Sequence, residues 1–251
     1  MSYSALPGRR AVLLGGAALA SAAPTVVRSR EAGGPWAVEL FTSQGCSSCP
    51  PADAQLGLLA RRPDIVALSY HVDYWDYIGW KDPFASRAMT ERQRAYANAL
   101  RQRSVYTPEM VFDGAAHDPG FDRRKIDALL AEAQRRSPRR ATPELTRRAD
   151  NTLAIVLTAF DLAGGAADIT LAVYDRRHST PVARGENTGA TLENFNVVRR
   201  LETVARWKGE AADWTVPGDR IGPAQGVAVL VQRSGHGAML GCNKLEPRAA
   251  S

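Results

Sequence analysis

Metal-ligating side chains are scarce in this sequence, which has three cysteines and four histidines among 251 residues. A structural zinc site takes about four ligands, and one Cys-x-x-Cys pair with scattered histidines is a poor source of them. A zinc site is therefore not expected. The odd cysteine count indicates one close pair, Cys46 and Cys49, and one leftover, Cys242.

Strong charge and long apolar runs are also missing. The formal net charge is +6 and the sequence pI is about 9.5, and two of the arginines lie in an N-terminal leader. This modest excess favours solubility and predicts no nucleic-acid partner. The apolar run at residues 11–23 is short and rich in Gly and Ala. It makes a poor transmembrane helix, so no stable membrane span is expected.

The N-terminus has the features of an export signal. Arg9 and Arg10 precede the apolar run, which ends in alternating small residues. This arrangement predicts a signal peptide over residues 1–22, of the twin-arginine type or the ordinary Sec type. A single-pass anchor is the alternative. Export predicts a periplasmic or secreted protein, in an oxidising compartment where disulfides persist.

The Cys-x-x-Cys stretch is where a strand meets a helix. An apolar run predicts a buried strand over 36–41, and apolar residues at helical spacing predict a helix over 50–61. A helix N-terminus lowers the pKa of a cysteine, and the two-residue spacing allows a Cys46–Cys49 disulfide. Cys46 is the expected attacking thiolate, nearer the solvent, and Cys49 the buried resolving thiol. A permanently closed structural disulfide is the alternative.

Further periodic segments follow. An apolar strand at 65–72 completes a strand–helix–strand unit with a parallel pair. The aromatic segment 70–84 contains turn residues and indicates a loop. Amphipathic helices are predicted over 86–103 and 122–135, with a strand between them. Residues 35–136 are thus predicted to form one α/β domain.

The C-terminal part has a different period. Residues 137–143 are rich in Arg, Ser and Pro and predict a solvated linker. Beyond them apolar residues alternate with polar ones, and turn signals recur at regular spacing. That spacing favours strand for the ambiguous segment 194–207. About seven strands over residues 144–247 predict a small all-β, sandwich-like domain.

The N-terminal domain resembles the thioredoxin-like superfamily. The resemblance rests on Cys46-Ser47-Ser48-Cys49 after a strand, on the strand–helix–strand unit, and on Thr107-Pro108 before the next strand. It implies a mixed sheet with flanking helices and a cis-proline beside an active disulfide. Two features depart from the pattern, Pro50-Pro51 after the second cysteine and Gly45 in place of the usual tryptophan. The proline pair is expected to shift the helix start and weaken its effect on the first cysteine.

The mature chain resembles still more closely DUF1223, a family of exported bacterial proteins. This resemblance covers most of residues 36–200 and implies the fold and a redox dithiol, with no established substrate. Its motifs are Val38–Asp53, His71–Asp76, Gly79–Phe84, Tyr106–Pro108 and Gly185–Asn187.

Five further residues are candidates around the cysteine pair. Thr107 and Pro108 are expected to line a substrate groove in which the Thr107 backbone pairs with an extended peptide; a plain turn is the alternative. Tyr74 and Trp75 form either a substrate wall above the disulfide or a packed loop core. Glu39 is a candidate proton relay to the resolving cysteine, or else an outward-facing strand residue.

His71 and Cys242 have competing interpretations. His71 either joins Cys46 and Cys49 as a copper ligand or is hydrogen-bonded at the end of its strand. Apart from this copper alternative, no cofactor is expected beyond the redox-active disulfide. Cys242 is expected to be a buried spectator, with mixed disulfides or dimerisation as the alternative.

These observations predict an exported thiol–disulfide oxidoreductase. Its Cys46–Cys49 dithiol or disulfide would act on protein or small-molecule thiols and disulfides, and a separate partner would restore its redox state. The alternative is a non-catalytic exported binding protein, in which the β-domain recognises a partner and the disulfide stiffens the scaffold.

Overall fold

The computed structural model describes residues 33–222 and 225–247, so the predicted signal peptide lies outside the described residues. Strands, α-helices and two short 3-10 helices (η) follow one another in this order: β1 (Trp36–Thr42), α1 (Pro50–Leu59), β2 (Ile65–His71), η1 (Asp76–Ile78), α2 (Arg87–Ala99), β3 (Glu109–Phe112), β4 (Ala116–Asp118), α3 (Arg123–Arg136), β5 (Glu144–Arg147), β6 (Leu153–Leu157), β7 (Ala167–Pro181), β8 (Thr191–Trp207), β9 (Ala212–Val216), η2 (Gly218–Arg220), β10 (Gly226–Arg233) and β11 (Met239–Leu245).

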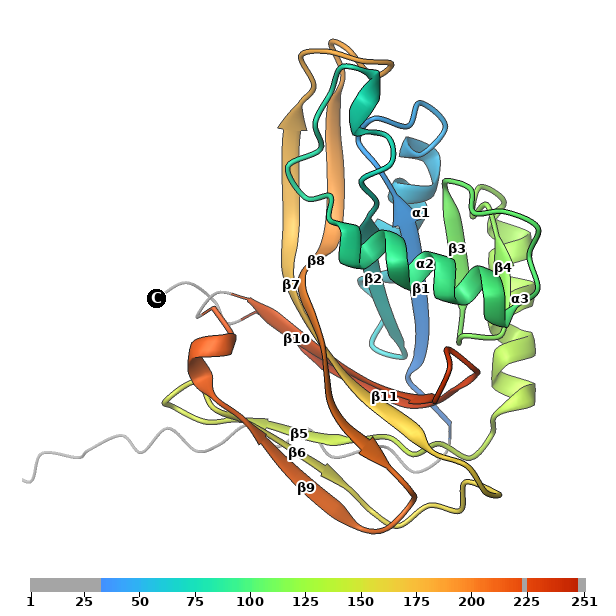
Figure 1. The fold of residues 1–251 in the computed structure, drawn as a ribbon, viewed down its shortest axis with the longest axis vertical. Helices are drawn as coiled ribbons and strands as arrows, with labels where there is room; N and C mark the ends of the chain where they lie inside the picture. Colours follow the sequence, from blue (N-terminus) through green and yellow to red (C-terminus); the bar gives the residue numbers. More distant parts are fainter. Residues whose placement is uncertain (1–32, 223–224, 248–251) are drawn as a thin grey trace, which may run out of the picture.

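A mixed eight-stranded sheet forms the framework, in the order β11-β10-β7-β8-β2-β1-β3-β4. The parallel β1–β2 pair is the predicted strand–helix–strand unit. One parallel bridge, between Ser69 and Val197, joins β2 to β8. Strands from both sides of the predicted 137–143 linker therefore share one sheet (Figure 1).

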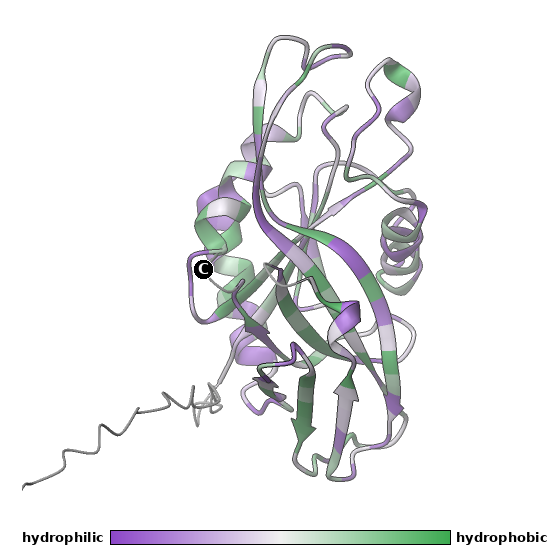
Figure 2. Cartoon of the chain, turned by 90° about the vertical axis from the view of Figure 1, so that its left-hand side faces the viewer, coloured by the Kyte–Doolittle hydropathy of each residue, from purple (hydrophilic) through white to green (hydrophobic). Residues whose placement is uncertain are grey.

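A second, antiparallel sheet of three strands, β5-β6-β9, covers part of the large one. Its apolar side chains pack with those of β7 and β10, and Trp207 lies in the same cluster. In Figure 2 apolar residues recur along the strands of this lower region. The predicted α/β class with a smaller all-β part is confirmed, and 194–207 is strand as predicted.

The two faces of β1 and β2 are both buried. Val38 and Leu40 pack with α1 and α3, whereas Ala37 and Phe41 pack with α2 on the opposite face. Figure 1 shows α2 crossing one face of the sheet, with α1 and α3 on the other. Complete burial explains why β1 is almost entirely apolar. Among the described residues, no helix is long and apolar enough to cross a membrane.

Arg140 is buried, although it lies in the segment predicted to be a solvated linker. Its side chain is 2% exposed. The guanidinium donates to both carboxylate oxygens of Asp113, at 2.6 and 2.8 Å, and to the carbonyl of Pro35 at 3.1 Å. The run is charged because one of its arginines is a buried partner for a buried carboxylate.

Candidate functional site

Cys46 and Cys49 form a disulfide at the start of α1. Cys49 is the N-cap residue, and the prolines that follow it occupy the first turn, where their missing N–H groups would have had no helical partner. Both cysteines are fully buried. The equal burial of the two cysteines does not distinguish them, so the expectation that Cys46 is the attacking thiolate stays a prediction.

The tip of the β7–β8 hairpin covers the disulfide. The Asn187 side-chain amide donates to the carbonyl oxygens of Gln44 and Cys46, at 2.9 and 3.0 Å. The Ser47 N–H donates to the Glu186 carboxylate at 3.3 Å. Figure 1 shows this tip beside the loop that contains η1. The Gly185–Asn187 motif thus acts as a cover for the cysteine pair.

The aromatic loop and the segment before β3 meet next to the pair. The Trp75 indole N–H donates to the Thr107 hydroxyl at 2.7 Å. The Ser48 hydroxyl lies 3.5 Å from the Thr107 carbonyl and 3.4 Å from the Cys46 sulfur. The Thr107–Pro108 bond is cis. Tyr74 instead extends toward α2, where its hydroxyl donates to Gln93 at 3.0 Å.

Buried polar residues lie behind the disulfide. The Asp82 carboxylate accepts from the Gln44 N–H at 2.8 Å and lies 2.7 Å from His71 Nδ1. Asp53 accepts from the Thr42 hydroxyl at 3.2 Å. Asp53 Oδ1 and His71 Nε2 are buried without a hydrogen-bond partner among the described residues. Unsatisfied buried polar atoms are uncommon, and these two lie in the region behind the disulfide.

The two carboxyls have opposite pKa shifts. Burial raises the pKa of Asp53 to about 7, against the opposing effects of His71 and the Thr42 hydrogen bond. Burial also acts to raise the pKa of Asp82. There the attraction of His71 and the hydrogen bonds from His71, Gln44 and Phe84 outweigh it, so the pKa lies below its usual value. Asp53 is thus the carboxyl that exchanges a proton near neutral pH.

Glu39 is buried, so its outward-facing alternative was wrong. It accepts a hydrogen bond from Arg92 Nε at 2.7 Å and a very short one from the Tyr96 hydroxyl. Among the described residues, its hydrogen bonds involve neither Cys46 nor Cys49. The structure places this carboxylate in an ion pair under α2, and its predicted relay role stays a prediction.

The remaining candidates lie as follows. His71 is bonded to Asp82 at the end of β2, and among the described residues no three His, Cys, Asp or Glu side chains group as metal ligands. The copper alternative therefore gains no support. Cys242 is buried, its thiol lies 3.1 Å from the Pro35 carbonyl, and burial raises the pKa of that thiol to about 12.

Sequence reasoning missed Asp53, Asp82 and the covering role of Asn187. Asp53 had a usable signal, because residues i and i+4 of a helix share a face and Cys49 lies one turn before it. Asn187 ends the Gly185–Asn187 motif, but it lies 141 residues from Cys46, so no local pattern connects the two. Only the tertiary structure brings these two together.

Comparison with known proteins assigns the chain to a family. The sequence matches the family described as "Protein of unknown function (DUF1223)" over residues 37–232. The chain belongs to the DUF1223 family. No curated protein matches this DUF1223 chain.

Two solved structures are similar to the DUF1223 chain. One is protein AGR_C_4864 from Agrobacterium tumefaciens, with 33% identity and a TM-score of 0.76, covering 89% of this chain and 98% of the other. The second is HBP35 of Porphyromonas gingivalis, with 13% identity and a TM-score of 0.54, covering 87% and 78%. At 13% identity, the similarity to HBP35 concerns the fold alone.

Proposed function

We propose that this DUF1223 protein is an exported, thioredoxin-like thiol–disulfide oxidoreductase that acts through Cys46 and Cys49. The observation that carries the proposal is the closed disulfide at the junction of β1 and α1, with Cys49 as N-cap. A thiolate formed there is favoured by the positive end of the helix dipole, while Pro50 and Pro51 offer no N–H and the N–H groups of Ala52 and Asp53 donate to the Cys49 carbonyl. The Ser48 hydroxyl, 3.4 Å from the Cys46 sulfur, can donate to the same thiolate.

The reaction is an exchange of disulfides. A substrate thiolate attacks the Cys46 sulfur, the Cys46–Cys49 bond breaks, and Cys49 leaves as a thiolate that takes up a proton. A second substrate thiol then attacks the mixed disulfide, which releases Cys46 and oxidises the substrate by two electrons. The reverse sequence reduces a substrate disulfide. A partner thiol or disulfide closes the cycle.

Asp53 is the residue suited to exchange the proton of Cys49. Its backbone N–H donates to the Cys49 carbonyl at 3.1 Å, one helical turn apart. The Cα–Cβ bonds of a helix tilt toward its N-terminus, so this side chain leaves the helix in the direction of the cysteine, and its carboxylate accepts from Thr42 at 3.2 Å. With a pKa of about 7 it can both accept and return a proton. Asp53→Asn is expected to remove an inflection near pH 7 from the rate of thiol exchange.

The test of the proposed function is a redox titration. Full-length protein is equilibrated in glutathione and dithiothreitol buffers, and free thiols are counted by maleimide gel shift. We expect a midpoint within the range of known oxidoreductases, about −120 to −270 mV. A pair that stays oxidised below about −300 mV is a structural disulfide, and the oxidoreductase proposal then fails.

A second candidate function is supported by the complete burial of both cysteines. In that case the protein is an exported binding protein whose disulfide stiffens the scaffold. Trapping separates the two. Cys49→Ser is expected to accumulate mixed disulfides through Cys46, and the Cys46→Ser, Cys49→Ser double variant is the control. If Cys49→Ser accumulates no mixed disulfide and both variants still bind the partner, the binding protein is favoured.

A further inference from the structure

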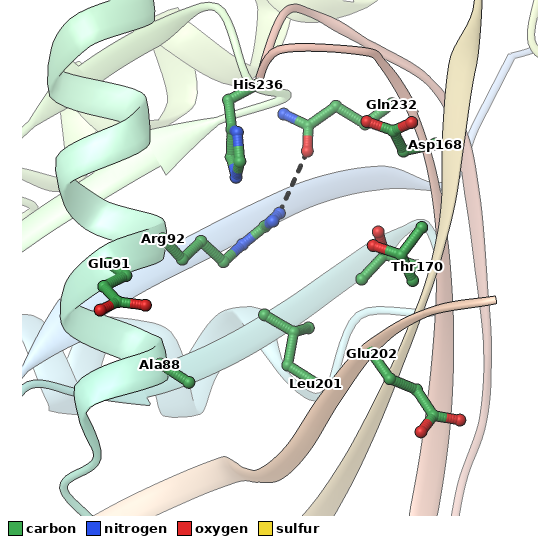
Figure 3. A pocket seen from close by; sticks show the side chains of 10 residues that line it. Ala88, Glu91, Arg92, Asp168, Thr170, Leu201, Glu202, Gln232 and His236 are labelled. Carbon is green, nitrogen blue, oxygen red and sulfur yellow. Dashed lines mark hydrogen bonds between the residues drawn. The ribbon is translucent and has the colours of Figure 1, made fainter. Parts of the chain in front are cut away.

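A cavity of about 250 Å³ lies between α2 and strands β7, β8 and β10, on the sheet face that α2 covers. It is separate from the disulfide and the residues that surround it. Figure 3 shows Arg92 reaching into it from α2 toward Gln232, with His236 on one side and Leu201 on the other. Its lining is mostly polar: Ala88, Glu91, Arg92, Asp168, Thr170, Leu201, Glu202, Thr203, Gln232 and His236.

Two of these side chains offer unused hydrogen-bond donors. Arg92 uses Nε and Nη2 for Glu39, Tyr96 and Gln232, which leaves Nη1 without a hydrogen bond to any described residue. His236 packs its ring edge-on to Tyr96, and within residues 33–222 and 225–247 its ring nitrogens make no hydrogen bond. Burial, and then the charge of Arg92, lowers the pKa of His236, so its imidazole is neutral near pH 7.

Asp168 and Thr170 offer hydrogen-bond acceptors. Asp168 and Gln232 are cross-strand neighbours, so the carboxylate lies beside the residue that Arg92 contacts. Its Oδ1 accepts from the Ser234 hydroxyl at 2.8 Å, and Oδ2 is left for a ligand. Thr170 lies two residues further along β7, on the same face, and its hydroxyl makes no hydrogen bond to the described part of the chain.

The charges of the lining leave one carboxylate unbalanced. Glu91 pairs with Arg87, and Glu202 pairs with Arg220. Arg92 pairs with Glu39. Asp168 makes no ion pair within the described residues, and its cross-strand neighbour on β8, Arg206, is exposed. The cavity therefore presents a negative charge on β7 opposite a guanidinium edge and an imidazole.

We propose that this cavity binds an amino-acid-sized zwitterion. The ammonium group lies against Asp168 and Thr170, and the carboxylate accepts from Arg92 Nη1 and from an imidazole N–H of His236. A drug-sized ligand occupies a pocket of about 300–1,000 Å³, so the volume here suits a smaller molecule. The proposal does not depend on the redox activity of the cysteine pair.

Calorimetric titration of the full-length protein tests the ligand class. The probes are glycine, alanine, serine, leucine, lysine and glutamate, together with propionate and ethylamine, which each lack one charged group of alanine. We expect at least one amino acid to bind at millimolar concentration or better. The two one-charge probes are expected to bind at least about tenfold more weakly than the best amino acid. Absence of binding by all six amino acids, or equal binding of propionate or ethylamine, overturns the proposal.

Variants then test the placement. Asp168→Asn is expected to weaken amino-acid binding by at least about tenfold, since it removes the unbalanced charge. Thr170→Val removes the neighbouring hydroxyl without changing charge, and we expect it to weaken amino-acid binding several-fold. This variant tests the site independently if Asp168→Asn does not fold. Asp213→Asn, at an exposed position of the small sheet, is the matched control. Unchanged affinity in Thr170→Val and in a folded Asp168→Asn rules the site out.

Discussion

Asp53 is an acidic residue of the usual kind for the first turn of a helix, but it is buried. It is 6% exposed, one carboxylate oxygen makes no hydrogen bond to the described residues, and the nearby His71 only partly offsets the cost of burial. Burial outweighs the hydrogen bonds from Thr42 and Asn194, so this carboxyl holds its proton more tightly than an exposed one. Its ionisation is therefore linked to the stability of the fold as well as to the chemistry of Cys49.

The linkage gives a prediction about stability and pH. The folded protein holds the Asp53 proton up to about pH 7, whereas the unfolded chain releases it near pH 4. Because the folded state binds more protons in this window, the free energy of unfolding falls as pH rises through it and levels off above pH 7. From pH 5 to pH 8 we expect the free energy of unfolding to fall by about 2–3 kcal/mol less in Asp53→Asn than in the wild type.

Urea unfolding of the wild type and the variant at both pH values measures this difference. Asp213→Asn, which removes an exposed carboxylate, provides the control slope. If the wild type and Asp53→Asn lose the same stability between pH 5 and pH 8, the pKa of Asp53 is not raised in the fold, and this carboxyl is not the group that exchanges a proton near pH 7.

At the scale of elements, the long β7–β8 hairpin joins the two parts of the molecule. One end of it packs with the small sheet, and its tip at residues 185–187 lies on the Cys-x-x-Cys turn. Asn187 makes two hydrogen bonds to backbone carbonyls of that turn. Cys46 is fully buried, and we expect displacement of the tip to open a route for a thiol to its sulfur.

Asn187→Ala is expected to speed reduction of the disulfide by tris(2-carboxyethyl)phosphine. Two hydrogen bonds of about 1 kcal/mol each correspond to a roughly 30-fold rise in the population with the tip displaced. Stopped samples analysed by maleimide gel shift give the rate. Arg184→Ala, an exposed change three residues away, should leave the rate unchanged. Equal rates for wild type and Asn187→Ala would mean that the reagent enters by another route.

Local periodicity predicted most elements, and distance along the chain explains the failures. The strand before Cys46 and the helix after Cys49 depend on neighbouring residues, and both are present as predicted. Helix α2 ends at Ala99, four residues before its predicted end, where Arg101 takes a left-handed φ of 54°. The Ser69–Val197 bridge and the burial of Cys46 arise from segments more than 100 residues apart, which no local pattern encodes.

At the scale of the whole molecule, Arg140 ties the predicted linker to both parts of the chain. It binds Asp113 at the end of β3 and the carbonyls of Pro35 and Met239. The ion pair is buried on both sides, with each side chain 2% exposed. The shared sheet and this pair lead us to expect that the described residues unfold as one cooperative unit.

Arg140→Ala leaves the Asp113 carboxylate buried without its cation, and we expect a loss of about 3–5 kcal/mol. Urea unfolding followed by circular dichroism and by tryptophan fluorescence measures it. The neighbouring exposed change Arg139→Ala should stay within about 0.5 kcal/mol of the wild type. Two separate transitions in the wild-type protein, or a small effect of Arg140→Ala, would show that the two parts fold independently.

The position of Asn187 in the chain sets an order of events during synthesis. Cys46 leaves the ribosome 141 residues before the side chain that covers its turn. At about 5–20 residues per second, the cysteine pair spends roughly 7 to 30 s without its cover. A nascent chain therefore meets oxidants, reductants and other thiols before the finished protein restricts access. We expect the redox state in which the turn is covered to depend on the oxidants and reductants that the chain meets before residue 187 is in place.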